Sequence, residues 1–383
     1  MARKNPNGAG TISLRKDGRY EAKVYVPQPD GTRARKTVYG KTWEECDDKR
    51  LDLVRRARQN IPTPTKSARL SEWLPTWLDV HIRPHRKHTT IAKYEMHVRL
   101  YLVPKLGTRK LETLSTADVR RMVAQVTAAS SAATAKEAHR VLRTALAAAQ
   151  RDELIARNVA SLVPPPQVTA RQTRPWTAEQ TVTFLAHARK GRDPLYAALV
   201  LSAALGLRRG EVLGLRWTDI DFAAGTLTTR SQLQRANGRL YEDTTKNRKV
   251  RTIPLPRLCV APLRWQRLRQ TAQREAAESG WADTQGYVFT TKSGRPIEPR
   301  NYTRTFTRLT AETGLPAIRL HDVRHGTATL LAAADVPPRV IMAILGHSQI
   351  AVTMNVYTHV VDRSQREAMD KMDGLLAPKR VTE

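Results

Sequence analysis

The chain has 383 residues, a length that predicts two or three domains at roughly 100 to 200 residues each. Its 65 Lys and Arg residues outnumber 35 Asp and Glu, and the net charge of +30 indicates a polyanionic partner. The longest uncharged run, 194–207, is too short to cross a bilayer, which favours a soluble cytoplasmic protein and excludes a membrane-spanning one. Two distant cysteines, Cys46 and Cys259, exclude a disulfide framework and a zinc knuckle and suggest buried or free thiols.

The basic excess extends over the whole chain. Segments 1–67, 68–170 and 171–383 each contain more basic than acidic residues. We therefore expect every predicted domain to contact a phosphate backbone, with binding that weakens steeply as salt is added.

Residues 1–60 predict a small sheet followed by one helix. Apolar residues alternate along 20–26, and turn dipeptides at 17–18 and 30–31 bound that strand, which favours three short antiparallel strands. The run Thr42-Trp43-Glu44-Glu45 resembles a capping box and opens a charged helix to about Gln59. A basic strand suits the DNA major groove, although a solvated edge strand is the alternative. Its basic residues are Arg33, Arg35 and Lys36.

Residues 68–162 predict a helical bundle. The segment 61–67 contains two prolines, which disfavour both helix and sheet, so we predict a linker there. Trp73 and Trp77 fit a helix core better than a base-stacking surface. Four helices follow from apolar spacing at i, i+3 and i+4: Leu70–Val80, Thr89–Tyr101, Thr116–Ala128 and Ala132–Arg151.

Residues 173–383 predict a mixed α+β domain behind a second, proline-rich linker at 163–173. One strand is expected at Thr226–Leu233, and an Asn-Gly turn at 237–238 leads into another, giving a hairpin or a three-stranded sheet with Lys246 near a tip. The fold class is therefore multidomain and mainly α with small β-sheets. Helices are expected from Thr177, at Leu195–Leu207, at Val260–Glu278 and at Asn301–Thr313.

The stretch from Leu320 to Val360 concentrates chemically active side chains. It contains four of the ten histidines together with Arg324 and Tyr357. Carboxylates of the kind that hold Mg²⁺ are not clustered there, and His321 and His325 at i, i+4 lack an H-E-x-x-H motif or a third ligand, so we expect no metal. Arginine forks bind the oxygens of a phosphodiester and stabilise the charge of its transition state. A tyrosine hydroxyl can then attack phosphorus and conserve the bond energy as an ester.

Five motifs carry a family resemblance. They are G-L-R-R-G-E with Arg208, T-K-N with Lys246, H-D-V-R-H with His321 and Arg324, L-G-H-S with His347, and Y-T-H with Tyr357. Together they resemble the conserved boxes of the tyrosine recombinases, the phage integrase family, over roughly residues 173–375. The helical segment resembles the family's core-type DNA-binding domain, and the N-terminal sheet and helix resemble its arm-type domain.

The resemblance implies a site-specific DNA recombinase that needs no cofactor. Tyr357 would join the 3′ phosphate and free a 5′ hydroxyl, while Arg208 and Arg324 clamp the scissile phosphate. Lys246 would protonate the leaving 5′ oxygen, with Lys249 as the competing candidate. His321 would act as acid and base. His347 would hydrogen-bond the phosphate.

Several interpretations remain open beside this one. The function alternatives are a chromosome-dimer resolvase, a type IB-like topoisomerase and a catalytically inert DNA-binding regulator. The partners implied are double-stranded DNA at core and arm sites, a homo-tetramer on DNA, a host DNA-bending protein and a directionality factor, in the bacterial cytoplasm at the nucleoid. An amphipathic helix at 363–376 would dock on a neighbouring subunit or on its own domain.

Five further residues near the motifs are given structural interpretations. Arg209 is interpreted as a surface or backbone contact and Arg216 as a solvated helix residue. His325 and His359 are interpreted as structural hydrogen-bonding residues. Asp322 would either orient a neighbouring arginine or cap the helix, and the sequence leaves both open.

Overall fold

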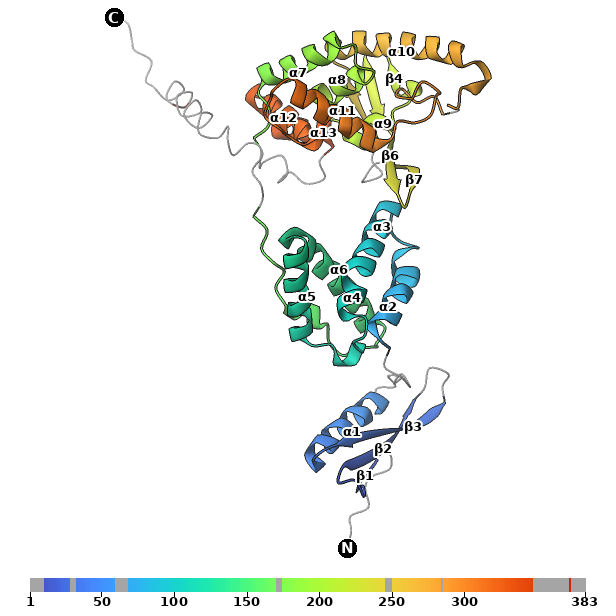
Figure 1. Cartoon of the computed structure of the whole chain (residues 1–383), viewed down its shortest axis with the longest axis vertical. Coiled ribbons are helices and arrows are strands. Elements are labelled where there is room, and N and C mark those ends of the chain that lie inside the picture. Colours follow the sequence, from blue (N-terminus) through green and yellow to red (C-terminus); the bar gives the residue numbers. More distant parts are fainter. Residues whose placement is uncertain are drawn as a thin grey trace, which may run out of the picture. The chain divides into compact units, whose positions relative to one another are not determined.

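The computed structural model describes residues 10–27, 32–58, 68–169, 174–244, 250–283 and 285–346, together with Met372. The chain divides into two compact units, residues 1–170 and 171–383, which are described separately below (Figure 1). Within the described ranges, no helix is long and apolar enough to cross a membrane. The first predicted linker, 61–67, lies outside these ranges, and residues 170–173 of the second also do.

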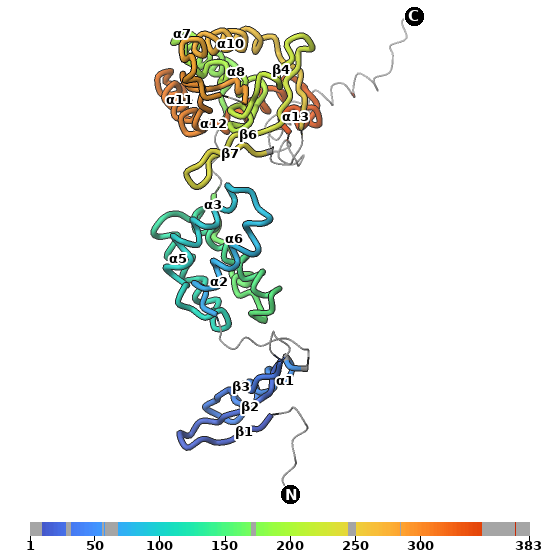
Figure 2. Tube along the Cα trace, turned by 90° about the vertical axis from the view of Figure 1, so that its right-hand side faces the viewer, coloured from blue at the N-terminus to red at the C-terminus, as the bar shows by residue number. Residues whose placement is uncertain are grey.

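The N-terminal sheet and helix form as the sequence predicts. The antiparallel strands β1 (Thr11–Leu14), β2 (Tyr20–Pro27) and β3 (Arg33–Gly40) lie in that order, and α1 (Trp43–Arg58) packs along one face (Figures 1 and 2). The Thr42 hydroxyl accepts a 3.2 Å hydrogen bond from the Glu45 amide at the start of α1. Val24 and Val26 pack against Leu53 and Val54 to form the core of this part.

The register of β2 and β3 separates the basic strand into two faces. Tyr25 lies opposite Arg35, and both are exposed on the face away from α1. Lys36 lies opposite the buried Val24, so its position is on the helix side of the sheet. Two of the three predicted basic residues therefore face outward, since side chains alternate along a strand.

The helical bundle has one continuous core. Trp73 and Trp77 are buried, and Trp77 stacks on Tyr94 with ring centroids 5.5 Å apart, which confirms the prediction that the tryptophans are core residues. Ser115 caps a helix through a 3.2 Å bond from the Asp118 amide. The helices are α2 (Leu70–Trp77), α3 (His88–His97), α4 (Val103–Leu106), α5 (Thr116–Ala129) and α6 (Ala132–Arg151), and π-helical turns at 78–82 and 98–102 follow α2 and α3.

The C-terminal unit is built around the apolar helix α8. This helix contacts α7, α9, α10 and α12, and the buried Tyr302 hydroxyl of α11 bonds to Ser202 at 2.7 Å and to the Ala198 carbonyl at 3.0 Å. The free thiol of Cys259 is buried in this core. The helices are α7 (Ala178–Lys190), α8 (Tyr196–Leu205), α9 (Arg209–Leu213), α10 (Arg257–Ala277), α11 (Pro299–Glu312), α12 (Leu320–Ala333) and α13 (Pro338–Leu345).

The strand predicted at 226–233 is wrong as a single element. It consists of β5 (Thr226–Thr229) and β6 (Ser231–Ala236), which belong to different sheets. The chain changes sheet at Arg230, whose side chain donates to Asp219 at 2.9 Å. Strands β4 (Ile220–Asp221), β5 and β8 (Arg251–Pro254) form one sheet, and β6 pairs with β7 (Arg239–Thr244) in a hairpin that projects from this unit (Figure 2).

This topology moves the predicted lysine away from the hairpin tip. The tip is the Asn237-Gly238 turn, where both residues have positive φ as a type I′ turn requires. Lys246 and Lys249 belong to the connection between β7 and β8, residues 245–249, which lies outside the described residues. The connection therefore joins two different sheets.

Candidate functional site

The corner between α8 and α9 positions the first predicted arginine. Gly206 adopts a left-handed conformation with φ of 58° and ends α8, as a glycine after a helix commonly does. A Cβ at this position would overlap the side chain of Leu345, so α13 packs directly on the backbone here. Two residues later, Arg208 is extended and precedes α9 as its N-cap.

A buried carboxylate holds Arg208 in place. The Glu211 side chain is 1% exposed, and its Oε1 accepts from Arg208 Nη1 at 2.7 Å. The other end of the Arg208 guanidinium, Nη2, donates to the Gly346 carbonyl at 2.9 Å. Arg208 is thus fixed at both ends between α9 and the C-terminal end of α13.

Arg251 completes this ion-pair group. Its Nη2 donates to Glu211 Oε2 at 2.9 Å and its Nη1 to Oε1 at 3.3 Å. Burial alone raises the pKa of Glu211, but the charges of Arg251 and Arg208 outweigh burial and hold this pKa below its ordinary value. Glu211 is therefore ionised at neutral pH and shared by two guanidinium groups.

Arg324 approaches the same place from α12. It is 3% exposed, and its Nη1 donates to the Gly206 carbonyl at 2.7 Å while Nη2 donates to the Leu345 carbonyl. Burial, followed by the charge of Arg208, lowers the pKa of Arg324 to about 9. The guanidinium still carries its charge at neutral pH. The two predicted arginines thus converge on consecutive carbonyls, those of Leu345 and Gly346.

His321 lies one turn before His325 on α12. Their rings meet edge to face, with centroids 5.2 Å apart. Partial desolvation, followed by the charges of His325 and Arg324, lowers the pKa of His321. A neutral imidazole at pH 7 can accept a proton, which the predicted acid and base role requires. Within the described ranges, no three His, Cys, Asp or Glu side chains gather where they could hold a metal ion.

The remaining predicted site residues lie outside the described residues. These are Lys246, His347 and Tyr357. Gly346, whose carbonyl binds Arg208, immediately precedes His347 in the sequence. Of the six residues, the structure thus brings Arg208 and Arg324 together and puts His321 within electrostatic reach of both.

Comparison with known proteins identifies the family. The phage integrase family matches residues 175–364, and the N-terminal SAM-like domain of phage integrases matches residues 69–125. A XerC-like tyrosine recombinase of Caldanaerobacter subterraneus is 29% identical over 90% of this chain and 93% of its own length. An integrase of Saccharopolyspora erythraea is 27% identical over 97% of each chain.

The chain belongs to the phage integrase family of tyrosine recombinases. It is therefore a site-specific DNA recombinase by family. The Tn1549 transposon integrase, solved with circular intermediate DNA, is similar with a TM-score of 0.67 and 25% identity over 80% of this chain and 100% of that one. A lambda integrase dimer bound to a core site shares the fold, with a TM-score of 0.55 and 17% identity over 93% of this chain and 96% of that one.

Two residues that hold the predicted arginines in this candidate site were missed by sequence reasoning. Glu211 stands three residues after Arg208 in G-L-R-R-G-E, the spacing of a capping box, and this signal could have identified it. Arg251 lies 40 residues away from Glu211 on β8, and nothing local in the sequence links the two. Its role depends on the fold.

The structure also corrects one interpretation and resolves another. Arg216 is not a solvated helix residue, because Nη2 donates to both Glu242 oxygens at 2.7 and 2.8 Å and to Gln285 at 2.8 Å. Asp322 caps α12 by accepting from the Arg319 amide at 2.9 Å, and it also binds the Arg319 side chain at 2.7 Å. Both suggested roles of Asp322 are therefore confirmed.

Replacing Gly206 by alanine should destabilise the site. The left-handed conformation costs a non-glycine residue roughly 1–2 kcal/mol, and the new methyl group also overlaps Leu345. Gly225→Ala is the matched control, since Gly225 has a similar φ of +63° with open space around the Cβ position. We expect both variants to lower the thermal unfolding temperature, Gly206→Ala more, and Gly206→Ala alone to slow DNA cleavage. Equal effects of the two would refute the close packing of Leu345 on Gly206.

Proposed function

We propose that this recombinase cleaves and rejoins duplex DNA through a 3′-phosphotyrosyl intermediate on Tyr357. The observation that carries the proposal is the convergence of Arg208 and Arg324 on the last two carbonyls before His347. The chain then reaches Tyr357 ten residues later. Two charged guanidiniums held together at one place are what an in-line displacement at a phosphodiester needs.

The arginines clamp the scissile phosphate. The hydrogen bonds of Arg208 to Glu211 and Gly346 use one hydrogen of Nη1 and one of Nη2, which leaves donors of its fork for the non-bridging oxygens. As the tyrosine oxygen attacks, negative charge grows on those oxygens. Guanidiniums held in place by protein contacts stabilise that charge without reorganising.

Proton transfers accompany the displacement. His321, with its lowered pKa, accepts the proton of the Tyr357 hydroxyl. Lys246 donates a proton to the departing 5′ oxygen, and His347 donates a hydrogen bond to the phosphate. The same steps in reverse, with a new 5′ hydroxyl as nucleophile, release Tyr357 and rejoin the strand. Bond energy is conserved, so no nucleotide cofactor is consumed.

The remaining parts of the chain bind DNA around this site. We assign residues 1–60 to arm-type sites, 68–162 to core-type sites and 173–383 to catalysis. The exposed face of the N-terminal sheet, with Tyr25 and Arg35 side by side, supports the first assignment. Four copies act on one pair of sites, with a host DNA-bending protein and a directionality factor, at the bacterial nucleoid in the cytoplasm.

Tyr357→Phe should abolish the covalent protein–DNA adduct. The test uses a duplex selected from a random-sequence pool by binding to the wild-type chain, nicked near its centre so that cleavage is trapped. Denaturing electrophoresis should show an adduct for wild type and none for Phe, because only the hydroxyl can form the ester. An adduct formed by the Phe variant would refute the nucleophile.

The same assay separates the alternatives. A recombinase cleaves the selected duplex and leaves a supercoiled plasmid without that sequence intact, whereas a topoisomerase relaxes any such plasmid. If the protein is a resolvase of chromosome dimers, a chain that lacks residues 1–60 would still act on the selected sequence. Binding with no adduct on any duplex would identify an inert regulator.

Arg208→Ala and Arg324→Ala should separate cleavage from binding. We expect each to slow adduct formation on the order of 100-fold or more, as the loss of a preorganised oxyanion donor does. DNA affinity should stay close to that of wild type, because many other cations contact the backbone. Arg209→Ala is the control, since Arg209 binds Thr303 on the neighbouring helix at 3.0 Å. A parallel loss of binding and cleavage would contradict the clamp.

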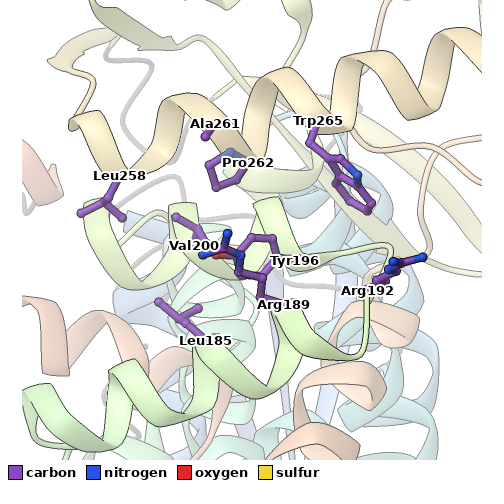
Figure 3. A pocket seen from close by; sticks show the side chains of 9 residues that line it. All are labelled: Leu185, Arg189, Arg192, Tyr196, Val200, Leu258, Ala261, Pro262 and Trp265. Carbon is purple, nitrogen blue, oxygen red and sulfur yellow. The ribbon is translucent and has the colours of Figure 1, made fainter.

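A hollow on the C-terminal unit suits an apolar segment. It has a volume of about 580 Å³ and lies between α7, α8 and α10 (Figure 3). Leu258 and Trp265 of α10 line it while remaining 57% and 38% exposed, and Arg189 and Arg192 lie at its side. Among the described residues of the predicted catalytic set, Arg208, His321 and Arg324 do not line it. We call it the α7–α10 groove.

We further propose that residues 363–376 of a neighbouring copy occupy the α7–α10 groove. Helical spacing puts Met369 and Met372 on one side of that segment, and its three carboxylates, which include Glu367 and Asp370, are matched in number by three basic residues. Thioether side chains fill irregular apolar hollows, and the carboxylates complement the two arginines of the groove. Such docking would link subunits on DNA.

Trp265→Glu should weaken assembly on DNA while leaving the free chain stable. Loss of a large aromatic anchor from an interface costs about 2 kcal/mol or more, roughly thirtyfold in the assembly constant. Leu268→Glu is the matched control, because Leu268 is 73% exposed on the same helix and does not line the groove. Native electrophoresis of the paired-site complex gives the readout. A lower unfolding temperature of free Trp265→Glu with unchanged assembly would mean that the tail packs on its own domain.

A further inference from the structure

The carboxylate of Glu211 is divided equally between two arginines. Arg208 supplies two donors, its amide to Oε2 at 3.0 Å and Nη1 to Oε1 at 2.7 Å. Arg251 supplies the other two, Nη2 to Oε2 at 2.9 Å and Nη1 to Oε1 at 3.3 Å. A carboxylate accepts about four hydrogen bonds, so these four donors use its full capacity.

Arg251 also contacts the second anchor of Arg208. A Cβ at Gly346 would overlap Arg251 Nη1, which means that this guanidinium lies against the backbone of Gly346. The Gly346 carbonyl is the acceptor of Arg208 Nη2 at 2.9 Å. Arg251 is thus beside both groups that fix Arg208, and with its side chain 13% exposed it is itself well buried.

The charges in this group explain why a second partner for Glu211 matters. A lone Arg208–Glu211 pair would be electrically neutral, and a neutral pair attracts a phosphate weakly. With Arg251 present, two guanidiniums share one carboxylate, and the charge of Arg324 adds to theirs at close range. The transition state of phosphoryl transfer carries more negative charge than the ground state, so the net positive charge favours it specifically.

We propose that Arg251 is a positioning residue of the recombination reaction: by sharing Glu211 with Arg208, it lets Glu211 anchor Arg208 without neutralising the charge that the scissile phosphate meets. This inference rests on the proposed function. Both hydrogen bonds that Arg251 makes to the site are to Glu211, and its Nε is buried without a hydrogen-bond partner among the described residues. It acts on the phosphate through Arg208.

Arg251→Gln tests the idea on the nicked, selected duplex. Single-turnover adduct formation should slow about 10- to 100-fold, the range found when a partner of a functional ligand is lost. DNA affinity, measured separately, should stay within about threefold, since one of many cations is removed. Arg251→Lys keeps the charge but loses the fork, so its rate should fall between wild type and Arg251→Gln.

A substrate with a neutral scissile group distinguishes charge from simple misfolding. In a methylphosphonate linkage a methyl group replaces one non-bridging oxygen, so the transition state carries one negative charge fewer. The rate of adduct formation by Arg251→Gln, relative to wild type, should therefore fall less on this substrate than on the phosphodiester. Misfolding would slow cleavage of both substrates by the same factor. Arg264→Gln is the control, because it removes an exposed positive charge from α10 that lies over Phe222 at 5.9 Å, and it should cleave both substrates at the wild-type rate.

The outcomes are separable. A wild-type chain that forms no Tyr357-dependent adduct refutes the proposed function and this inference with it. A normal wild-type adduct, combined with full-rate cleavage by Arg251→Gln, overturns the role of Arg251 alone. If Arg251→Gln slows cleavage of the phosphodiester and of the methylphosphonate by the same factor, that result also overturns the role of Arg251. A thermal unfolding temperature well below that of wild type would then identify Arg251 as a purely structural residue.

Discussion

The buried carboxylate of Glu211 is the constraint on which the geometry of the recombinase site depends. An ionised group with 1% exposure is stable only when its oxygens are fully paired. Here the pairing comes from α9 through Arg208 and from β8 through Arg251. The Glu211 side chain therefore links the start of α9 to the start of β8. The connection that contains Lys246 ends just before β8.

Backbone carbonyls extend this constraint to the rest of the site. Gly206 presents its carbonyl to Arg324, and Leu345 and Gly346 present theirs to Arg324 and Arg208. Both glycines are left-handed, with φ of 58° and 66°, and each ends a helix. Because helix ends leave carbonyls without intrahelical partners, two such ends supply acceptors for two arginines. The two arginines of the site are thus held by carbonyl groups at the C-terminal ends of α8 and α13.

The sequence predicted most of the fold because its signals are local. The helix cap at Thr42 and the turn at 237–238 each depend on neighbouring residues, and both form as expected. The two-sheet arrangement around Arg230 depends on its bond to Asp219, and no local pattern encodes it. Local and non-local signals differ in the same way within the site. The motifs indicated Arg208 and Arg324, whereas the ion pair between Arg251 of β8 and Glu211 of α9 forms only through the fold.

Under the proposed function, binding of the scissile phosphate would relieve an electrostatic cost of this site. Burial and the neighbouring charge of Arg208 lower the pKa of Arg324 to about 9, which means that its charged form is less stable in the folded chain than in water. At every pH below that value the folded protein bears this cost. A phosphate placed against Arg208 and Arg324 supplies the missing negative charge, raises the pKa of Arg324 and removes part of the cost. The energy stored in concentrated positive charge is therefore released on contact with the phosphodiester, and most strongly when that group gains charge in the transition state.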